Sequence, residues 1–264
     1  MYETLDLERR GAAAIIRLNR PQALNAWNHQ LGLDLLDAVR SVAADDAVRA
    51  VCVTGSGRAF SSVDDLRYLK SRGLTPEGHV DVHTALTTVY HPILTTLLRM
   101  PKPVVAALNG PAVGIGCSLA LCCDLLLCAE SAYMLLGFVN IGLVPDGGAL
   151  ALLSTRAGAG RAAAMALLGE RVPAQELLRS GIVDEVLPDD ELDDRVHARL
   201  DALAAGPTRS YAGSKRQMDK WLYAGLDEQL ELEARIQQEM AASADFREGV
   251  TAFLEKRPPT FTGE

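Results

Sequence analysis

Short apolar runs with the length of buried β-strands alternate along this chain with segments of helical periodicity. Four of the runs are clear: 13–18, 50–54, 103–108 and 125–129. The segments between them carry leucine and valine at helical spacing, and glycine, proline or asparagine ends many of them. An apolar run is buried only where other elements cover it. The alternation therefore predicts an α/β fold with strands and helices in layers.

Beyond residue 190 the pattern changes, and only helices are predicted. Their apolar stripe, which includes Leu230, Ile236 and Phe253, needs a surface to cover, either in the same subunit or in a neighbouring one. The predicted helices of this tail are 190–204, 208–224, 226–242 and 245–256. The other predicted elements are a hairpin at 3–18, helices at 28–43, 80–99, 114–121, 147–153 and 161–168, and strands at 133–136 and 183–186.

The composition narrows the classes of partner. With 264 residues the chain is near the upper limit for one hydrophobic core, and its net charge of −8 argues against broad binding to nucleic acid or anionic membranes. The five cysteines show no CxxC spacing and lie in apolar stretches, which is typical of reduced thiols in the cytosol. The N-terminus lacks an apolar signal segment, and Ser118 and Asp124 interrupt the most apolar stretch. We expect a cytoplasmic protein with no metal site, no nucleic-acid partner and no membrane partner.

Five segments of the chain carry a resemblance to a known family. They are GRAFSSVDDL at 57–66, KPVVAALNGPAVGIGCSLA at 102–120, IGLVPDGG at 141–148, LNRPQALNA at 18–26 and FLEKR at 253–257. In this order they resemble the enoyl-CoA hydratase/isomerase (crotonase) superfamily over practically the whole chain. The resemblance implies a spiral core of ββα turns at 1–200 and a helical trimerisation region at 201–264, in a homotrimer or a hexamer. It also implies an acyl-CoA or enoyl-CoA substrate, with coenzyme A as part of the substrate and no tightly bound cofactor.

The first two of these segments each place a peptide N–H at a strand-to-helix turn, where N–H groups lack acceptors and the helix terminus is electropositive. Two such groups pointing at one thioester carbonyl form an oxyanion hole. The resemblance assigns the N–H groups of Ser62 and Ile115 to this role. Two rival interpretations of the glycine-rich segment fit less well. A dinucleotide fingerprint needs glycine where Leu119 stands, and a nucleophile elbow at Ser118 lacks its closing glycine.

The resemblance also identifies a departure from the hydratase pattern. Hydratases of the family hold and ionise one water molecule between two glutamates. The corresponding positions here are Ser118 and Phe138. Serine is too weak a base to replace a carboxylate, and phenylalanine neither accepts a proton nor orients water. We therefore do not expect hydration of the two-glutamate type.

Asp146 lies between Pro145 and two glycines, just before a predicted helix. This context is typical of a helix N-cap. The resemblance adds a second interpretation, because some family isomerases and ring-isomerising enzymes place their single catalytic acid at this position. One carboxylate suffices for a 1,3-proton shift, and desolvation in an apolar pocket would raise its pKa. The residues predicted to line that pocket are Val63, Leu135, Leu136 and Phe138.

Contacts with coenzyme A are implied by the resemblance along two loops and the C-terminal tail, with Arg20 and Arg58 as further cations. We expect the tail residues to come from a neighbouring subunit and residues 67–92 to shape the acyl end of the site. The predicted contacts are Ala23, Leu24, Ala59, Ser61, Ser62, Asp64, Leu66, Ile115, Phe253 and Lys256.

Three functions remain open from the sequence. The first is an isomerase-like enzyme that uses Asp146 and the oxyanion hole. The second is a thioester hydrolase or another acyl-CoA lyase, in which Asp146 activates water and Ser118 assists. The third is a non-catalytic protein that binds acyl-CoA with the same fold.

Overall fold

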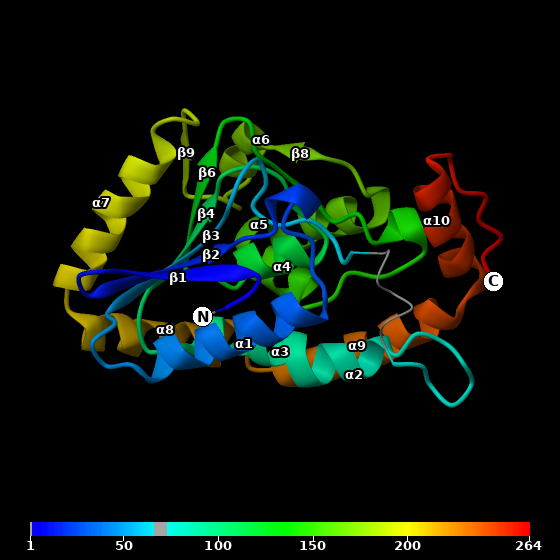
Figure 1. Cartoon of the computed structure of the whole chain (residues 1–264), viewed down its shortest axis with the longest axis horizontal. Coiled ribbons are helices and arrows are strands. Elements are labelled where there is room, and N and C mark those ends of the chain that lie inside the picture. The colour runs from blue at the N-terminus through cyan, green and yellow to red at the C-terminus, as the bar shows by residue number, and fades with distance from the viewer. Residues whose placement is uncertain (1, 66–72) are drawn as a thin grey trace.

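A six-stranded sheet forms the centre of the chain in the computed structural model, which describes residues 2–65 and 73–264 (Figure 1). The strand order is β1-β2-β3-β4-β6-β9, and all neighbours are parallel except the β1–β2 hairpin. The strands are β1 (Leu5–Arg10), β2 (Ala13–Leu18), β3 (Ala50–Gly55), β4 (Val104–Leu108), β6 (Leu125–Ala129) and β9 (Glu185–Leu187). The structure confirms the α/β class and the four strands that the apolar runs predicted.

A second, smaller sheet lies beside the first in the order β5-β7-β8. Its strands are β5 (Ala112–Val113), β7 (Tyr133–Leu135) and β8 (Val172–Pro173). Two of them contain only two residues. Such short strands have no periodicity of their own, which is why the sequence predicted β7 but neither β5 nor β8.

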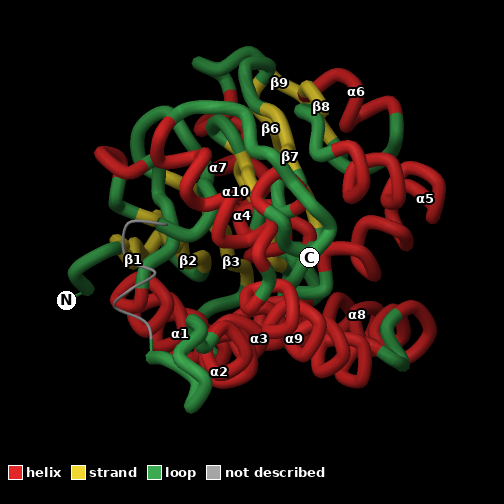
Figure 2. Tube along the Cα trace, turned by 90° about the vertical axis from the view of Figure 1, so that its right-hand side faces the viewer, coloured by secondary structure: helices red, strands yellow, loops and turns green. Residues whose placement is uncertain are grey.

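Helices α1, α2, α3, α8 and α9 lie together below the strands in both views (Figures 1 and 2), while α7 packs against β2, β3, β4 and β6. The helices before the tail are α1 (His29–Ala44), α2 (Val82–Ala85), α3 (His91–Arg99), α4 (Ile115–Leu121), α5 (Ala149–Leu168) and α6 (Ala174–Arg179). Those of the tail are α7 (Leu192–Ala205), α8 (Thr208–Leu222), α9 (Leu226–Ala242) and α10 (Ala244–Glu255). The predicted division at residue 200 falls inside α7. No helix in the described ranges has both the length and the apolar character needed to cross a bilayer.

Three predicted helices differ in the structure. The segment 80–99 is divided into α2, a π-helical turn at Leu86–Tyr90 and α3. The helices predicted at 147–153 and 161–168 are joined as α5, but Gly158 inside it has φ 81° and interrupts the helical geometry. Glycine accepts a positive φ at little cost, so the chain bends there without ending the element.

The parallel pairing of β3 with β4 brings the segments that follow these strands to the same edge of the sheet. Ser61 pairs with Ala112 there through an isolated bridge. Gly116, in the first turn of α4, lies so close that an added Cβ would overlap the carbonyl oxygen of Ser61. Only glycine permits this approach, and it places the N-terminus of α4 directly against the segment after β3.

All five cysteines are buried and free, as the sequence predicted. Burial raises the pKa of the Cys52, Cys117 and Cys128 thiols to about 12, and it also raises the pKa values of Cys122 and Cys123. We expect a thiol-specific disulfide reagent at about pH 8 to label none of them rapidly in the folded protein, because the thiolate is the reactive form. In denaturant all five thiols should react. Fast labelling of the native protein would contradict this burial.

Candidate active site

A narrow inner chamber, with a cavity volume of about 40 Å³, opens beside the N-terminus of α4. It is enclosed by the segment after β3, the 137–146 segment, and helices α9 and α10. Most of the wall formed by the described residues is apolar, and the polar side chains among them are Asp64, Asp146 and Gln237. The other lining residues are Val63, Val82, Gly114, Ile115, Gly137, Phe138, Ile141, Leu143 and Phe246. The chamber is therefore an apolar site with carboxylates in its wall.

An outer chamber with a cavity volume of about 370 Å³ adjoins the inner one, because both are lined by Val63, Gly137 and Ile141. Ser62 and Leu135 line it, as does Phe253 of α10. Phe253 therefore lies beside the site of the same chain. The narrow apolar chamber and the larger outer chamber therefore lie next to each other.

The four predicted pocket residues are found at three places. Val63 and Phe138 line the inner chamber with Asp146. Leu135 lines the outer chamber instead. Leu136 is fully buried in the hydrophobic core and belongs to neither lining, so its prediction is wrong.

Ile115 is the first residue of α4, after Gly114 with φ 57° and ψ −124°. The N–H group at this position has no acceptor within its own helix. Ile115 also lines the inner chamber. Ile115 therefore lies at a helix N-terminus in the chamber wall, and its role as an oxyanion donor stays a prediction.

The prediction that Ser62 supplies the other N–H group is wrong. Its N–H donates to the carbonyl oxygen of Leu24 at 3.0 Å. The pairing continues along the segment, since Trp27 N–H donates to Val63 O and Asp65 N–H donates to Trp27 O. The next residues, Val63 and Asp64, line the inner chamber. At these two residues the segment after β3 forms part of the chamber wall.

Two other predicted coenzyme contacts lie in the interior. Ser61 is fully buried, and its hydroxyl accepts from Trp27 Nε1 at 3.0 Å and donates to Asn25 O at 3.1 Å. Ala59 is also buried, with its carbonyl accepting from Asn25 Nδ2 at 2.8 Å. Neither side chain is accessible to a ligand, and contact of this loop with coenzyme A stays a prediction. These residues hold the turn in place.

The remaining predicted contacts lie in different parts of the structure. Ala23 and Leu24 are half-buried, and Leu24 contacts the turn through its bond from Ser62. Asp64 lines the inner chamber, where its Oδ1 accepts from Tyr90 OH at 2.8 Å. Lys256 is exposed at the end of α10. Leu66 lies outside the described residues, as do 67–72 of the segment expected to shape the acyl end.

The two additional cations differ in their surroundings. Arg20 is buried, where it donates to Ala26 O and forms an ion pair of 3.4 Å with Asp65. It therefore stabilises the turn rather than reaching toward a ligand. Arg58 is exposed.

Asp146 is 6% exposed and lines the inner chamber. Its Oδ2 accepts from Gln237 Nε2 at 2.9 Å. Helix α5 begins at Ala149, with Gly148 as its N-cap residue, so Asp146 precedes the cap by two positions. The N-cap interpretation is therefore wrong, and the side chain belongs to the chamber.

Ser118 is fully buried behind Asp146 and is absent from the linings of both chambers. Its hydroxyl donates to the backbone carbonyl of Asp146 at 2.7 Å. Since this hydroxyl is already committed to the backbone, the catalytic role predicted for Ser118 is wrong. Its contact instead fixes the backbone of residue 146.

Gln237 and Glu233 of α9 are site residues that the sequence analysis missed. Glu233 is 4% exposed, and its Oε1 accepts from Gly148 N–H at 2.7 Å and lies 3.5 Å from His91 Nε2. The sequence does contain a signal that could have identified them. These two polar residues are one helical turn apart and interrupt the apolar stripe of the helix.

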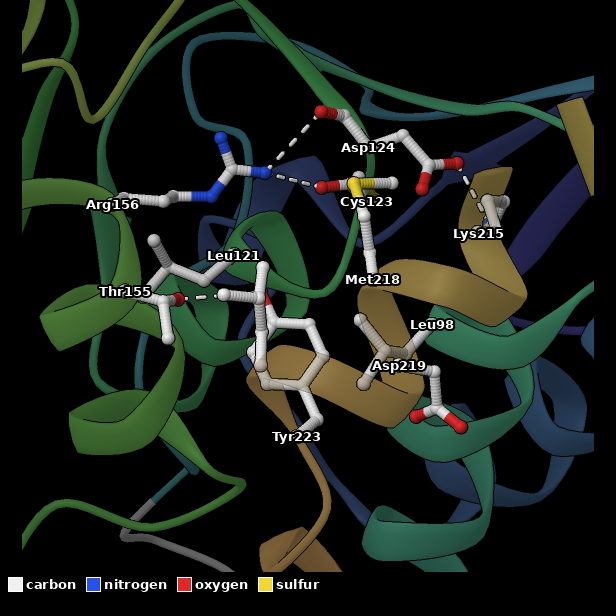
Figure 3. A pocket seen from close by; sticks show the side chains of 11 residues that line it. Leu98, Leu121, Cys123, Asp124, Thr155, Arg156, Lys215, Met218, Asp219 and Tyr223 are labelled. Carbon is white, nitrogen blue, oxygen red and sulfur yellow. Dashed lines mark hydrogen bonds and ion pairs between the residues drawn. The ribbon is translucent and has the colours of Figure 1, made fainter. Parts of the chain in front are cut away.

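A separate hollow between α5 and α8 is also lined by charged residues (Figure 3). Lys215 Nζ donates to Asp124 Oδ2 at 2.7 Å, and Arg156 donates to the carbonyl oxygen of Cys123 at 2.6 Å. Burial raises the pKa of Asp124, while Lys215 opposes the shift. None of the predicted site residues lines this hollow. Its charges stabilise the packing of the tail on the core.

The parallel sheet, the strand-to-helix turns that meet at its edge and the helical tail define a crotonase-type fold. A solved structure described as an enoyl-CoA hydratase from Mycobacterium avium subsp. paratuberculosis has the same fold, with a TM-score of 0.90, 35% identity and coverage of 99% of this chain and 100% of that one. The family model for enoyl-CoA hydratase/isomerase matches residues 8–264, and the chain belongs to this family.

Two relatives of this chain carry different functional names. A probable enoyl-CoA hydratase of Rhodobacter capsulatus is 42% identical, with 99% of each chain covered. A 1,2-epoxyphenylacetyl-CoA isomerase of Escherichia coli is 37% identical, with 94% of each chain covered. Both are similar over nearly their full lengths. Membership alone therefore does not choose between hydration and isomerisation.

Proposed function

We propose that this chain is an enoyl-CoA isomerase-like enzyme in which Asp146 moves a proton along the acyl chain of a coenzyme A thioester. The observation that carries the proposal is the position of Asp146, a buried carboxylate in the wall of an apolar chamber beside the N-terminus of α4. The two positions at which the resemblance expects hydratase glutamates hold Ser118, which is buried and bonded to the backbone, and Phe138. The E. coli relative named a 1,2-epoxyphenylacetyl-CoA isomerase supports isomerisation of a coenzyme A thioester on this scaffold.

The proposed reaction is a 1,3-proton shift. The Asp146 carboxylate removes a proton from C2 of a 3-enoyl thioester, and the electron pair of that C–H bond moves toward the thioester carbonyl to form a dienolate. The Ile115 N–H and an N–H from residues 63–64 donate to the resulting oxyanion. Asp146, now protonated, returns the proton to C4 as the double bond moves from C3–C4 to C2–C3. No atom is gained or lost, and no positioned water is needed.

A hydrolytic function is the second candidate, because Asp64 places another carboxylate in the wall of the same chamber. Its bond from Tyr90 OH holds it at that wall. Two carboxylates can orient and deprotonate a water molecule, which could attack a thioester carbonyl.

A panel of 2-enoyl- and 3-enoyl-CoA thioesters tests the assignment by mass and ultraviolet analysis. We expect unchanged mass with a shifted double bond. Added water would establish hydration instead, and released coenzyme A would establish hydrolysis. Saturable binding without conversion across the panel would overturn the enzymatic proposal and favour a binding protein.

We also propose that the chain associates with copies of itself as a trimer or hexamer. Support comes from large apolar side chains that remain exposed in the single chain. Trp221 on α8 is 85% exposed, and Leu167 and Leu168 at the end of α5 are 74% and 61% exposed. Exposed apolar groups of this size are typical of contact surfaces.

A further inference from the structure

Helix α9 holds both ends of the segment that carries Asp146. Gln237 Oε1 accepts from Val144 N–H at 3.1 Å. One helical turn earlier, Glu233 Oε1 accepts from Gly148 N–H at 2.7 Å. Residues four apart lie on the same face of a helix, so the two side chains fix the segment at two points. The position of Asp146 in the chamber thus depends on a helix far along the chain.

The other end of the Gln237 side chain contacts Asp146 itself. Its Nε2 donates to Asp146 Oδ2 at 2.9 Å, and Gln237 is 1% exposed. The two partners determine the orientation of this amide. A backbone N–H can only donate, so the amide oxygen must face Val144 and the amide nitrogen must face Asp146. Hydrogen bonds to an ionised acceptor are stronger than neutral ones, especially away from water.

We propose that Gln237 is a positioning residue for Asp146, which holds the carboxylate in one orientation and favours its charged form as the base. This inference rests on the proposed function, in which Asp146 moves the proton. A 1,3-shift requires the same carboxylate to reach two carbons in turn. A displacement of about 1 Å in such a group can lower a rate by roughly 10²-fold.

Within residues 2–65 and 73–264, the titratable groups considered near Asp146 come from three elements. Glu233 of α9 contacts Gly148, and His91 of α3 faces Glu233. Asp64, from the segment after β3, lines the same chamber. Gln237 is neutral and donates a hydrogen bond among these acidic neighbours. Its replacement by glutamate would therefore add a like charge next to Asp146.

Two substitutions separate positioning from simple structural support. Gln237→Glu keeps an acceptor for Val144 N–H but loses the donor to Asp146, whereas Gln237→Met loses both. We expect each variant to lower kcat for a 3-enoyl-CoA by about 10- to 100-fold, with KM changed less than about threefold, because the carboxylate and not the binding surface is disturbed. In Gln237→Glu the acidic limb of the kcat–pH profile should also move to higher pH, since two neighbouring carboxylates resist ionising together.

Gln238→Met is the matched control. Gln238 accepts from the N–H groups of Val82 and His83 and donates to Val80 O, so its loss also removes backbone bonds from α9. These hydrogen bonds go to the backbone before and within α2 and not to Asp146, so we expect the acidic limb of the kcat–pH profile of Gln238→Met to match that of the wild type. Thermal melts of each variant show whether the fold is retained.

The outcomes distinguish the two proposals. If Gln237→Glu is folded and keeps both kcat and the acidic limb of the wild type, Gln237 only supports the backbone and the inference is overturned. The same conclusion holds if Gln237→Met is folded and fully active. If these variants behave as expected but Asp146→Asn remains active, the proposed function fails instead, and the positioning role fails with it.

Discussion

Asp146→Asn should lower kcat for isomerisation of a 3-enoyl-CoA by about 10²- to 10⁴-fold, the range that a positioned acid–base group contributes. Asparagine has the same shape as aspartate, and its amide oxygen can still accept from Gln237 Nε2. It cannot take up the proton from C2. Because the side chain is replaced by an isostere, KM and the melting temperature should change little.

Asp64→Asn is the matched control for this substitution, since Asp64 is the other carboxylate in the lining of the inner chamber. Its carboxylate is already bonded to Tyr90 OH, and we expect a smaller loss of kcat. Steady-state kinetics on the same substrate compares the two variants. A folded Asp146→Asn enzyme with wild-type turnover would eliminate Asp146 as the shuttle. If only Asp64→Asn were inactive, the roles of the two residues would be reversed.

Ile115→Pro should lower kcat by about 10²- to 10³-fold, the usual effect of removing one oxyanion-hole donor. Proline has no N–H, so the substitution deletes the proposed donor. It should do so without unfolding α4, because Ile115 is the first residue of that helix and proline is favoured at this position. Gly114 before it can accept the backbone restriction that proline imposes on its neighbour.

Ile115→Val provides the comparison for this prediction. Valine keeps the N–H and removes one methylene, which should cost about 0.5–1.5 kcal/mol in the free energy of unfolding and little in kcat. Turnover is measured together with urea denaturation for both variants. A stable Ile115→Pro enzyme with the turnover of Ile115→Val would show that this N–H does not stabilise the oxyanion.

The main strands were predictable because burial on both faces leaves continuous apolar runs in the sequence. Residues 50–54 and 125–129 formed β3 and β6 as expected. The two-residue strands β5 and β8 leave no such run, since their pairing depends on the neighbours that the fold provides. The bend of α5 at Gly158 could not be predicted either, because a glycine within a helical pattern is compatible both with the end of a helix and with a bend.

The candidate site was only partly predictable. The context of Asp146 was compatible both with a cap and with a catalytic acid, and only the start of α5 at Ala149 separates the two. The Ser62 assignment failed because its N–H bonds to Leu24, a backbone pairing that no side chain signals. Gln237 was missed because it lies 91 residues from its partner. The contact between Gln237 and Asp146 forms only when α9 packs against the site, so the sequence around Gln237 does not indicate it.

The dependence of the Asp146 segment on α9 sets a limit on protein engineering within this scaffold. A chimera that combined the first 200 residues of this chain with the tail of another relative would separate Asp146 from both Glu233 and Gln237. Grafting an aspartate at the matching position of a different relative would likewise leave that carboxylate without an amide opposite it. Acyl-group preference could be redesigned near the inner chamber, but transplanting the proton-transfer step requires exchanging two distant stretches of sequence together.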